Sequence, residues 1–158
     1  MKKTHLFSNL LAIFIALLVT NCTDNQPNKE LSLIVDDYIQ TYQEREDWEK
    51  LLSFYSDSIY LNDINLGMEF NGIDSFKVFY DWPNSNFKKL SPEQEHFFID
   101  DVIVLENKAI IRGNFNPFYW KGEVQEWAGP FIFCLYFNED NKIIQQYDYV
   151  KYPARFLE

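Results

Sequence analysis

The sequence predicts an α+β fold in which helices come first and an antiparallel sheet follows. In the first third of the chain, apolar residues recur at intervals of three and four, which is the spacing of one helix face. From about residue 97 onward, apolar and polar residues alternate in segments that short turn sequences separate. Runs of helices followed by runs of strands are typical of α+β domains.

Three helices are expected before the sheet. The first spans residues 28–46, because its apolar residues fall on one face: Leu31, Val35, Tyr38, Ile39 and Tyr42. Asp47 is a suitable N-cap for a second helix at residues 48–54, since its carboxylate can accept a backbone N–H. A third helix is expected at about residues 73–81, and Pro83 ends it.

Five strands are expected, and short turns join the last four: residues 58–63, 97–105, 109–120, 123–137 and 142–150. The polar residues 84–94 are expected to form a mobile loop over any cavity. His96 is expected to start a strand and to face solvent. The charged residues 44–47 are expected to be a solvated helix end.

The N-terminal segment has the order of a secretory signal. Two lysines precede an apolar run at residues 6–19, and a polar stretch follows Cys22. The run is shorter than the roughly 20 apolar residues that a membrane-spanning helix needs. It resembles the signal peptide of a bacterial lipoprotein, which is cut before a cysteine that carries the lipid.

This resemblance implies that acyl chains such as palmitate on Cys22 anchor the protein to the lipid bilayer, on an extracytoplasmic face of the cell envelope. The alternative is an ordinary secreted protein, because Asn21 stands where such signals usually carry Gly, Ala or Ser. The chain then divides into a signal peptide, a polar tether and one domain: residues 1–21, 22–28 and 29–158.

Composition narrows the classes of function. The net charge is −10 and no basic patch is present, which disfavours nucleic-acid binding. His96 and Cys134 are the histidine and the cysteine that remain after residue 22, so neither a metal site nor another cofactor is expected. Aromatic residues make up 18% of the chain, more than a core of this size needs, which favours an aromatic cavity or groove.

Across residues 30–152 the chain resembles the SnoaL-like branch of the nuclear-transport-factor-2-like superfamily. The resemblance rests on the opening helix pair and on three further stretches: residues 54–63, 71–76 and 141–149. It implies a cone-like curved antiparallel sheet packed against about three N-terminal helices, enclosing a pocket. It implies little about function, because one scaffold in this superfamily carries isomerases, hydrolases, cyclases and noncatalytic domains.

The resemblance to limonene epoxide hydrolase, a member of that superfamily, implies one set of catalytic residues. Its attacking water is held by a Tyr-x-Asn pair and an Asp, which match Tyr60, Asn62 and Asp148 here. Two neutral groups can hold a water while a carboxylate deprotonates it. The proton donor of that enzyme corresponds to Asn114, which cannot serve as an acid, so the resemblance supports only the base.

Ketosteroid isomerase implies the alternative set, with Asp63 as general base and Tyr38 as oxyanion donor. Its second oxyanion donor corresponds to Phe133, which has no donor group. Tyr60 and Asn62 share one face of a strand while Asp63 lies on the other, so the two sets exclude one another unless the strand contains a bulge.

Four aromatic residues are expected to bind a ligand by stacking: Trp82, Tyr119, Trp120 and Trp127. The expected function is binding of a small, mainly apolar molecule, with Asp-based acid–base catalysis of the isomerase, hydrolase or cyclase type. The alternative is a noncatalytic interaction module of the cell envelope that forms a homodimer through its sheet.

Overall fold

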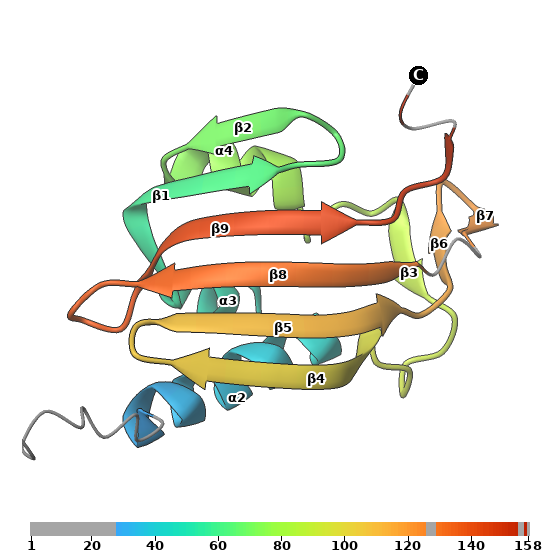
Figure 1. Ribbon diagram of the computed structural model, residues 1–158. Coiled ribbons are helices and arrows are strands. Elements are labelled where there is room, and N and C mark those ends of the chain that lie inside the picture. Colours follow the sequence, from blue (N-terminus) through green and yellow to red (C-terminus); the bar gives the residue numbers. More distant parts are fainter. Residues whose placement is uncertain (1–27, 126–128, 155–156, 158) are drawn as a thin grey trace, which may run out of the picture.

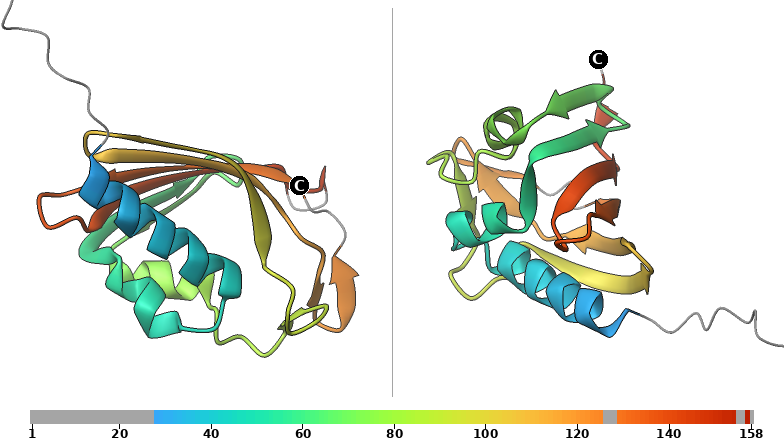
Figure 2. Two further views of the ribbon diagram at one scale, coloured as in Figure 1. Left: turned by 90° about the horizontal axis from the view of Figure 1, so that it is seen from below. Right: turned by 90° about the vertical axis from the view of Figure 1, so that its left-hand side faces the viewer.

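The computed structural model describes residues 28–125, 129–154 and 157. In this part of the chain, three helices lie against one face of a curved six-stranded sheet (Figures 1 and 2). The helices are α2 (Lys29–Glu44), α3 (Trp48–Ser53) and α4 (Ile73–Tyr80). The strands of the large sheet are β1 (Tyr55–Asp63), β2 (Met68–Asn71), β4 (Phe97–Leu105), β5 (Lys108–Phe115), β8 (Pro130–Phe137) and β9 (Ile143–Val150).

The strand order of the large sheet is β2-β1-β9-β8-β5-β4. Strands β1 and β9 pair in parallel, and the other neighbours pair antiparallel. Figure 2 shows the helices on the inner face of the sheet, with the outer face left uncovered. The predicted α+β class, with a curved antiparallel sheet and about three helices, is confirmed.

Helix α2 forms where its residues predict it. The side chain of Asn28 caps it by accepting the backbone N–H of Leu31 at 3.1 Å. The apolar face expected from the sequence is buried against the sheet, and burying each large side chain contributes roughly 1.5–3 kcal/mol. The helix ends at Arg45, whose left-handed backbone (φ 52°) directs its N–H to the carbonyl of Thr41.

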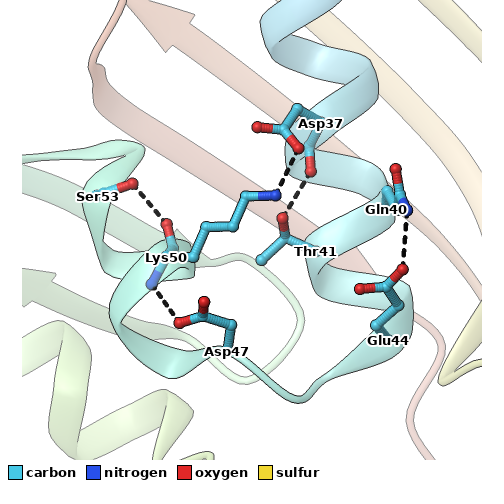
Figure 3. A network of polar contacts seen from close by, with 7 residues as sticks. All are labelled: Asp37, Gln40, Thr41, Glu44, Asp47, Lys50 and Ser53. Carbon is cyan, nitrogen blue, oxygen red and sulfur yellow. Dashed lines mark hydrogen bonds and ion pairs between the residues drawn. The ribbon is translucent and has the colours of Figure 1, made fainter.

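Polar contacts fix the corner between α2 and α3 (Figure 3). The carboxylate of Asp47 accepts the backbone N–H of Lys50 at 2.8 Å, which confirms Asp47 as the N-cap of α3. The Lys50 ammonium lies 2.6 Å from a carboxylate oxygen of Asp37 on α2. Both charges are exposed, so this ion pair contributes little, whereas an N-cap contributes about 1 kcal/mol.

The curvature of the sheet has a local origin at the β4–β5 pair. A bulge between Ile99 and Asp101 bends β4 opposite Gly113. A Cβ atom at Gly113 would lie 2.3 Å from the carbonyl oxygen of Phe98 and 2.8 Å from Cζ of Phe131. Glycine therefore allows the backbone of the neighbouring strand and an aromatic ring to approach at this bend.

A second sheet, which the sequence does not predict, lies at one end of the first (Figure 1). It has the order β3-β6-β7 and consists of β3 (Phe87–Lys89), β6 (Phe118–Trp120) and β7 (Glu123–Gln125). The strand expected at residues 109–120 breaks at Pro117, which has no N–H for a ladder. The segment 84–94, expected to be a loop, contains β3. Strand β2 was also not expected.

Residues 1–27 lie outside the described part of the chain, and with them the expected signal peptide and Cys22. Among the helices that the structure describes, none is long and apolar enough to cross a membrane.

Candidate functional site

A cavity of about 400 Å³ opens between the inner face of the sheet, the ends of α2 and α4, and the small sheet. This volume lies within the range of roughly 300–1,000 Å³ that is usual for small-molecule sites. Most of the lining is aromatic or aliphatic: Tyr42, Leu66, Phe79, Tyr80, Phe87, Phe115, Phe118, Trp120, Phe133, Val150 and Tyr152. The remaining lining residues are Arg45, Asp81, His96, Gln125 and Asp148.

Asp148 is a buried carboxyl group in the wall of this cavity. Strand β9 turns it inward together with Gln146, and its side chain is held by two donors. The hydroxyl of Tyr80 donates to Oδ2 at 2.9 Å, and Nε2 of Gln146 donates to Oδ1 at 2.8 Å. Burial raises the pKa of Asp148 to about 7, although both hydrogen bonds lower it.

The carboxyl group ends a chain of buried hydrogen bonds. Nε2 of Gln146 also donates to the hydroxyl of Tyr80 at 2.6 Å, and its Oε1 accepts from the hydroxyl of Tyr55 at 2.8 Å. Because the hydrogen of Tyr55 is used there, Tyr38 must be the donor in the 3.0 Å contact between the two tyrosine hydroxyls. This chain fixes the orientation of the Gln146 amide, and hence the donors that Asp148 receives.

Burial raises the pKa of Tyr38, Tyr55 and Tyr80 well above the usual range of tyrosine. The three hydroxyls therefore stay protonated at neutral pH, which leaves Asp148 as the group of this network that changes its charge between acidic and neutral conditions.

The structure does not bring Tyr60 and Asn62 together with Asp148. Leu61 is completely buried, so its neighbours on β1 lie on the opposite, outer face of the sheet. There Nδ2 of Asn62 donates to the hydroxyl of Tyr60 at 3.2 Å, and the ring centroids of Tyr60 and Tyr147 lie 6.0 Å apart. The water-holding arrangement inferred from limonene epoxide hydrolase is therefore absent from this part of the chain.

The alternative pair, Asp63 and Tyr38, lies on the same side of the sheet as Asp148, but neither residue lines the cavity. Asp63 accepts the backbone N–H of Leu66 at 3.0 Å and the hydroxyl of Tyr152 at 2.5 Å. Tyr38 reaches the site through its hydroxyl contact with Tyr55 and through its ring, which lies edge-on to the cavity residue Tyr42 with centroids 6.0 Å apart. In this geometry both residues support the site rather than face a ligand.

The four expected stacking residues have different positions. Trp120 lines the cavity. Trp82 lies behind the lining, with its ring centroid 5.3 Å from that of Tyr42. Tyr119 precedes Trp120 on β6, points to the opposite face, and borders a separate surface pocket. Trp127 lies outside the described residues.

Sequence reasoning placed two lining residues in solvent, and the structure corrects both. His96 is 7% exposed, and burial, together with the charges of Arg45 and Lys89, lowers its pKa well below the usual range. Arg45 lies with Cζ 3.8 Å from the ring centroid of Phe87. Arg45 is covered because β3 pairs with β6 and brings Phe87 over the end of α2.

Gln146 and Tyr80 were also missed. Gln146 could have been predicted, because it lies two positions before Asp148 on one strand and therefore shares its face. No pattern in the neighbouring sequence indicates a role for Tyr80, which reaches Asp148 from a helix 68 residues away in the chain. Within the described residues, no three His, Cys, Asp or Glu side chains cluster in a way that could hold a metal ion.

No protein-family model and no curated protein sequence matches the chain. Solved structures do match it. A protein from Shewanella denitrificans OS-217 designated a SnoaL-like polyketide cyclase has a TM-score of 0.64 and 16% identity, covering 79% of this chain and 93% of that one. An NTF2-like protein of unknown function from Burkholderia xenovorans LB400 has a TM-score of 0.60 and 12% identity, covering 80% and 87%.

A third structure, designated a ketosteroid isomerase from Kribbella flavida DSM 17836, has a TM-score of 0.58 and 10% identity, covering 80% of this chain and 82% of that one. At these identities the likeness shows a shared fold, which is that of SnoaL-like and NTF2-like domains. It does not carry over an activity, because this fold supports many.

Proposed function

We propose that this NTF2-like domain binds a small, mainly apolar molecule in its cavity and that Asp148 exchanges a proton with the bound molecule. The observation that carries the proposal is a buried carboxyl group, with a pKa of about 7, in the wall of an aromatic cavity. Such a group is present in both protonation states at neutral pH, so it can accept a proton and return it. Similar structures designated a cyclase and a ketosteroid isomerase support ligand binding.

The chemistry available to the site is proton transfer next to a polar group of the ligand. The ionised Asp148 takes a proton from carbon or from water, and the acid that forms gives it back at another atom. Tyr80 and Gln146 act as positioning residues, because their donors hold the carboxyl group at a fixed angle to the cavity. Isomerisation, hydrolysis and cyclisation all use such a step.

Binding can be tested without the natural ligand, with 2-naphthamide and 2-acetylnaphthalene as neutral probes. Saturation at a hundred times Kd stabilises a protein by about 2.7 kcal/mol, which thermal unfolding detects. Val150→Phe places a ring in the cavity and should abolish the shift, whereas Val124→Phe on the exposed face of β7 should retain it. An equal shift in wild type and Val150→Phe would exclude this cavity as the binding site.

Proton exchange can be tested with 2-acetylnaphthalene in D₂O. If Asp148 acts as a base, the wild-type protein should accelerate exchange of the methyl protons, as followed by NMR, and Asp148→Asn should not. Equal exchange rates for the two proteins, with binding of the probe intact, would contradict a catalytic role of Asp148 and leave ligand binding as the function.

We also propose that the protein is a lipoprotein anchored through Cys22 on an extracytoplasmic face, which the sequence at residues 6–22 supports. Stable anchoring takes two or more acyl chains, since one holds only marginally. Mass spectrometry of the N-terminal peptide should show an acylated Cys22, and Cys22→Ser should move the protein to the soluble fraction. An unmodified cysteine in membrane-extracted protein argues against the anchor.

A second candidate function, self-association through the sheet, has one observation in its favour. The uncovered outer face carries a cross-strand row of largely apolar residues: Ile103, Ile110, Cys134 and Tyr147. Ile103 and Ile110 are 43% and 41% exposed. Sedimentation should then show a dimer that Ile110→Glu dissociates and that Val78→Glu on α4 leaves intact. A wild-type monomer at all concentrations rejects this candidate.

A further inference from the structure

Arg45 enters the cavity from an unusual backbone position. It ends α2 in the left-handed conformation (φ 52°) that glycine usually occupies, and which costs other residues roughly 1–2 kcal/mol. The polar contacts between Asp37, Asp47 and Lys50 hold the corner that follows (Figure 3). The side chain consequently lies over Phe87 rather than in solvent with the charged residues beside it in the sequence.

The hydrogen-bonding capacity of Arg45 is unused. Its guanidinium lies over the rings of Phe87 and Trp82, with Cζ 3.8 and 5.2 Å from their centroids. Within the described residues it makes no hydrogen bond and no ion pair, and its Nε is buried without a partner. Contacts with aromatic faces stabilise the charge but satisfy none of the five directional N–H donors. Burial lowers the pKa of Arg45 only to about 10, so it is cationic at neutral pH.

Two further nitrogens at this end of the cavity lack partners in the described part of the chain. They are Nδ1 of His96 and Nε1 of Trp82, both on largely buried side chains. A buried polar atom left without a hydrogen bond is costly, and in native proteins it calls for an explanation. Nε of Arg45 and Nε1 of Trp82 are donors, and Nδ1 of His96 donates in one of its two neutral tautomers, so these nitrogens indicate a place for an acceptor.

Arg45, His96 and Asp148 line the same cavity, and Trp82 lies behind its wall. Tyr42 lies between His96 and Asp148, with its ring centroid 5.9 Å from that of Tyr80, which holds Asp148, and 6.0 Å from that of His96. The acidic group nearest Arg45 in the lining is Asp81, which is exposed and accepts from Nδ2 of Asn84 at 2.5 Å. The charge of Asp81 acts on Arg45 and raises its pKa, but among the described residues the two form no ion pair.

We propose that Arg45 binds the carboxylate of the ligand, so that the molecule is an apolar monocarboxylate whose body lies along the aromatic wall and extends toward Asp148. The planar guanidinium presents paired N–H donors that match the two oxygens of a carboxylate. This inference rests on the proposed function, because it concerns the same cavity, and it names the chemical class of the molecule that the cavity takes.

Calorimetric titration with 2-naphthoate and 2-naphthamide at pH 7.5 tests the inference, since the two probes share a shape and differ in charge. Wild-type protein should bind 2-naphthoate about tenfold more tightly or better, the typical gain from a charged hydrogen bond. Arg45→Gln and Arg45→Met should remove this preference by weakening 2-naphthoate alone. Arg112→Gln, on the outer face of β5, should retain it.

Equal affinities of the wild-type protein for the two probes would overturn the inference and leave the proposed function standing. A preference that survives in both Arg45 variants would overturn it as well. If neither probe binds, the cavity does not hold apolar molecules, and the proposed function fails together with the inference.

Discussion

Asp63 and Asp148 are paired neighbours across the parallel strands β1 and β9, and both side chains are buried on the inner face of the sheet. Their surroundings differ. Asp63 is enclosed by Tyr152 and the backbone of the turn that follows β1, whereas Asp148 borders the cavity. Burial raises the pKa of both, and Asp63 raises that of Asp148 further. Of this pair, only Asp148 lines the cavity.

Replacing Asp148 with Asn should change how stability depends on pH. The folded protein holds the Asp148 proton up to about pH 7, while the unfolded chain releases it near pH 4. Between these values the wild-type protein loses stability as pH rises, by an amount on the order of 4 kcal/mol in total. Asp148→Asn lacks this loss. Urea unfolding should therefore show that the free energy of unfolding of the variant increases relative to that of the wild type from pH 4 to pH 8.

Asp57→Asn is the matched control, because Asp57 is an exposed carboxylate on β1. Its difference from wild type should stay constant across the same pH range. A constant difference for Asp148→Asn as well would contradict a buried, proton-holding carboxyl group at position 148.

Tyr80→Phe should move the pH at which this stability is lost to a higher value. The hydroxyl of Tyr80 donates to the carboxylate and lowers the pKa of Asp148, so its removal leaves the ionised form less stable. The ring still stacks on Phe76, with centroids 4.5 Å apart, and packing is retained. Unfolding curves at several pH values give the pH at the midpoint of this stability loss. Tyr60→Phe, on the outer face, should leave that pH unchanged.

Asp63→Asn should destabilise the protein by about 1–3 kcal/mol at pH 7, because the Asn amide keeps one of the two acceptor oxygens, so either Tyr152 or the N–H of Leu66 loses its buried acceptor. Binding of 2-naphthamide should remain, since Asp63 does not line the cavity. A variant of normal stability that fails to bind the probe would show instead that Asp63 belongs to the binding site.

Gly113→Ala should destabilise the domain by about 1–3 kcal/mol, the usual effect of overpacking. The added Cβ would meet the carbonyl oxygen of Phe98 at 2.3 Å, and a backbone atom cannot move aside as a flexible side chain can. Chemical denaturation measures the loss. Gly122→Ala is a contrasting variant, because its Cβ meets no atom within 4 Å, and only its positive φ of 83° opposes the change.

Local periodicity predicted the parts of the fold that depend on local sequence. The buried face of α2 and the Asp47 cap follow from residues within a few positions of one another. Alternation places Asp148 on one face of its strand with Val150, but it assigns Ile143 and Tyr149 to the other face, so the sequence leaves the direction of Asp148 open and only the structure shows that it points inward.

The parts that could not be predicted depend on pairing between distant segments. Arg45 and His96 look solvated in the sequence. The pairing of β3 with β6 brings Phe87 over Arg45, and rings from several distant segments, among them Phe87 and Phe115, cover His96. Tyr60 and Asn62 illustrate a second limit. Alternation shows that they lie opposite Asp63, but the choice of the inner face depends on how β1 packs beneath α4 and beside β9.

The titration of the Asp148 carboxyl carbon by NMR, in the free protein and in the protein saturated with 2-naphthamide, tests the central claim most directly. The structure predicts a midpoint of about 7 in the free protein, and a further change when the probe excludes water from the cavity. A midpoint near the usual value of about 4 for an aspartate, unchanged by the probe, would contradict a proton-exchanging carboxyl group in a ligand-binding cavity.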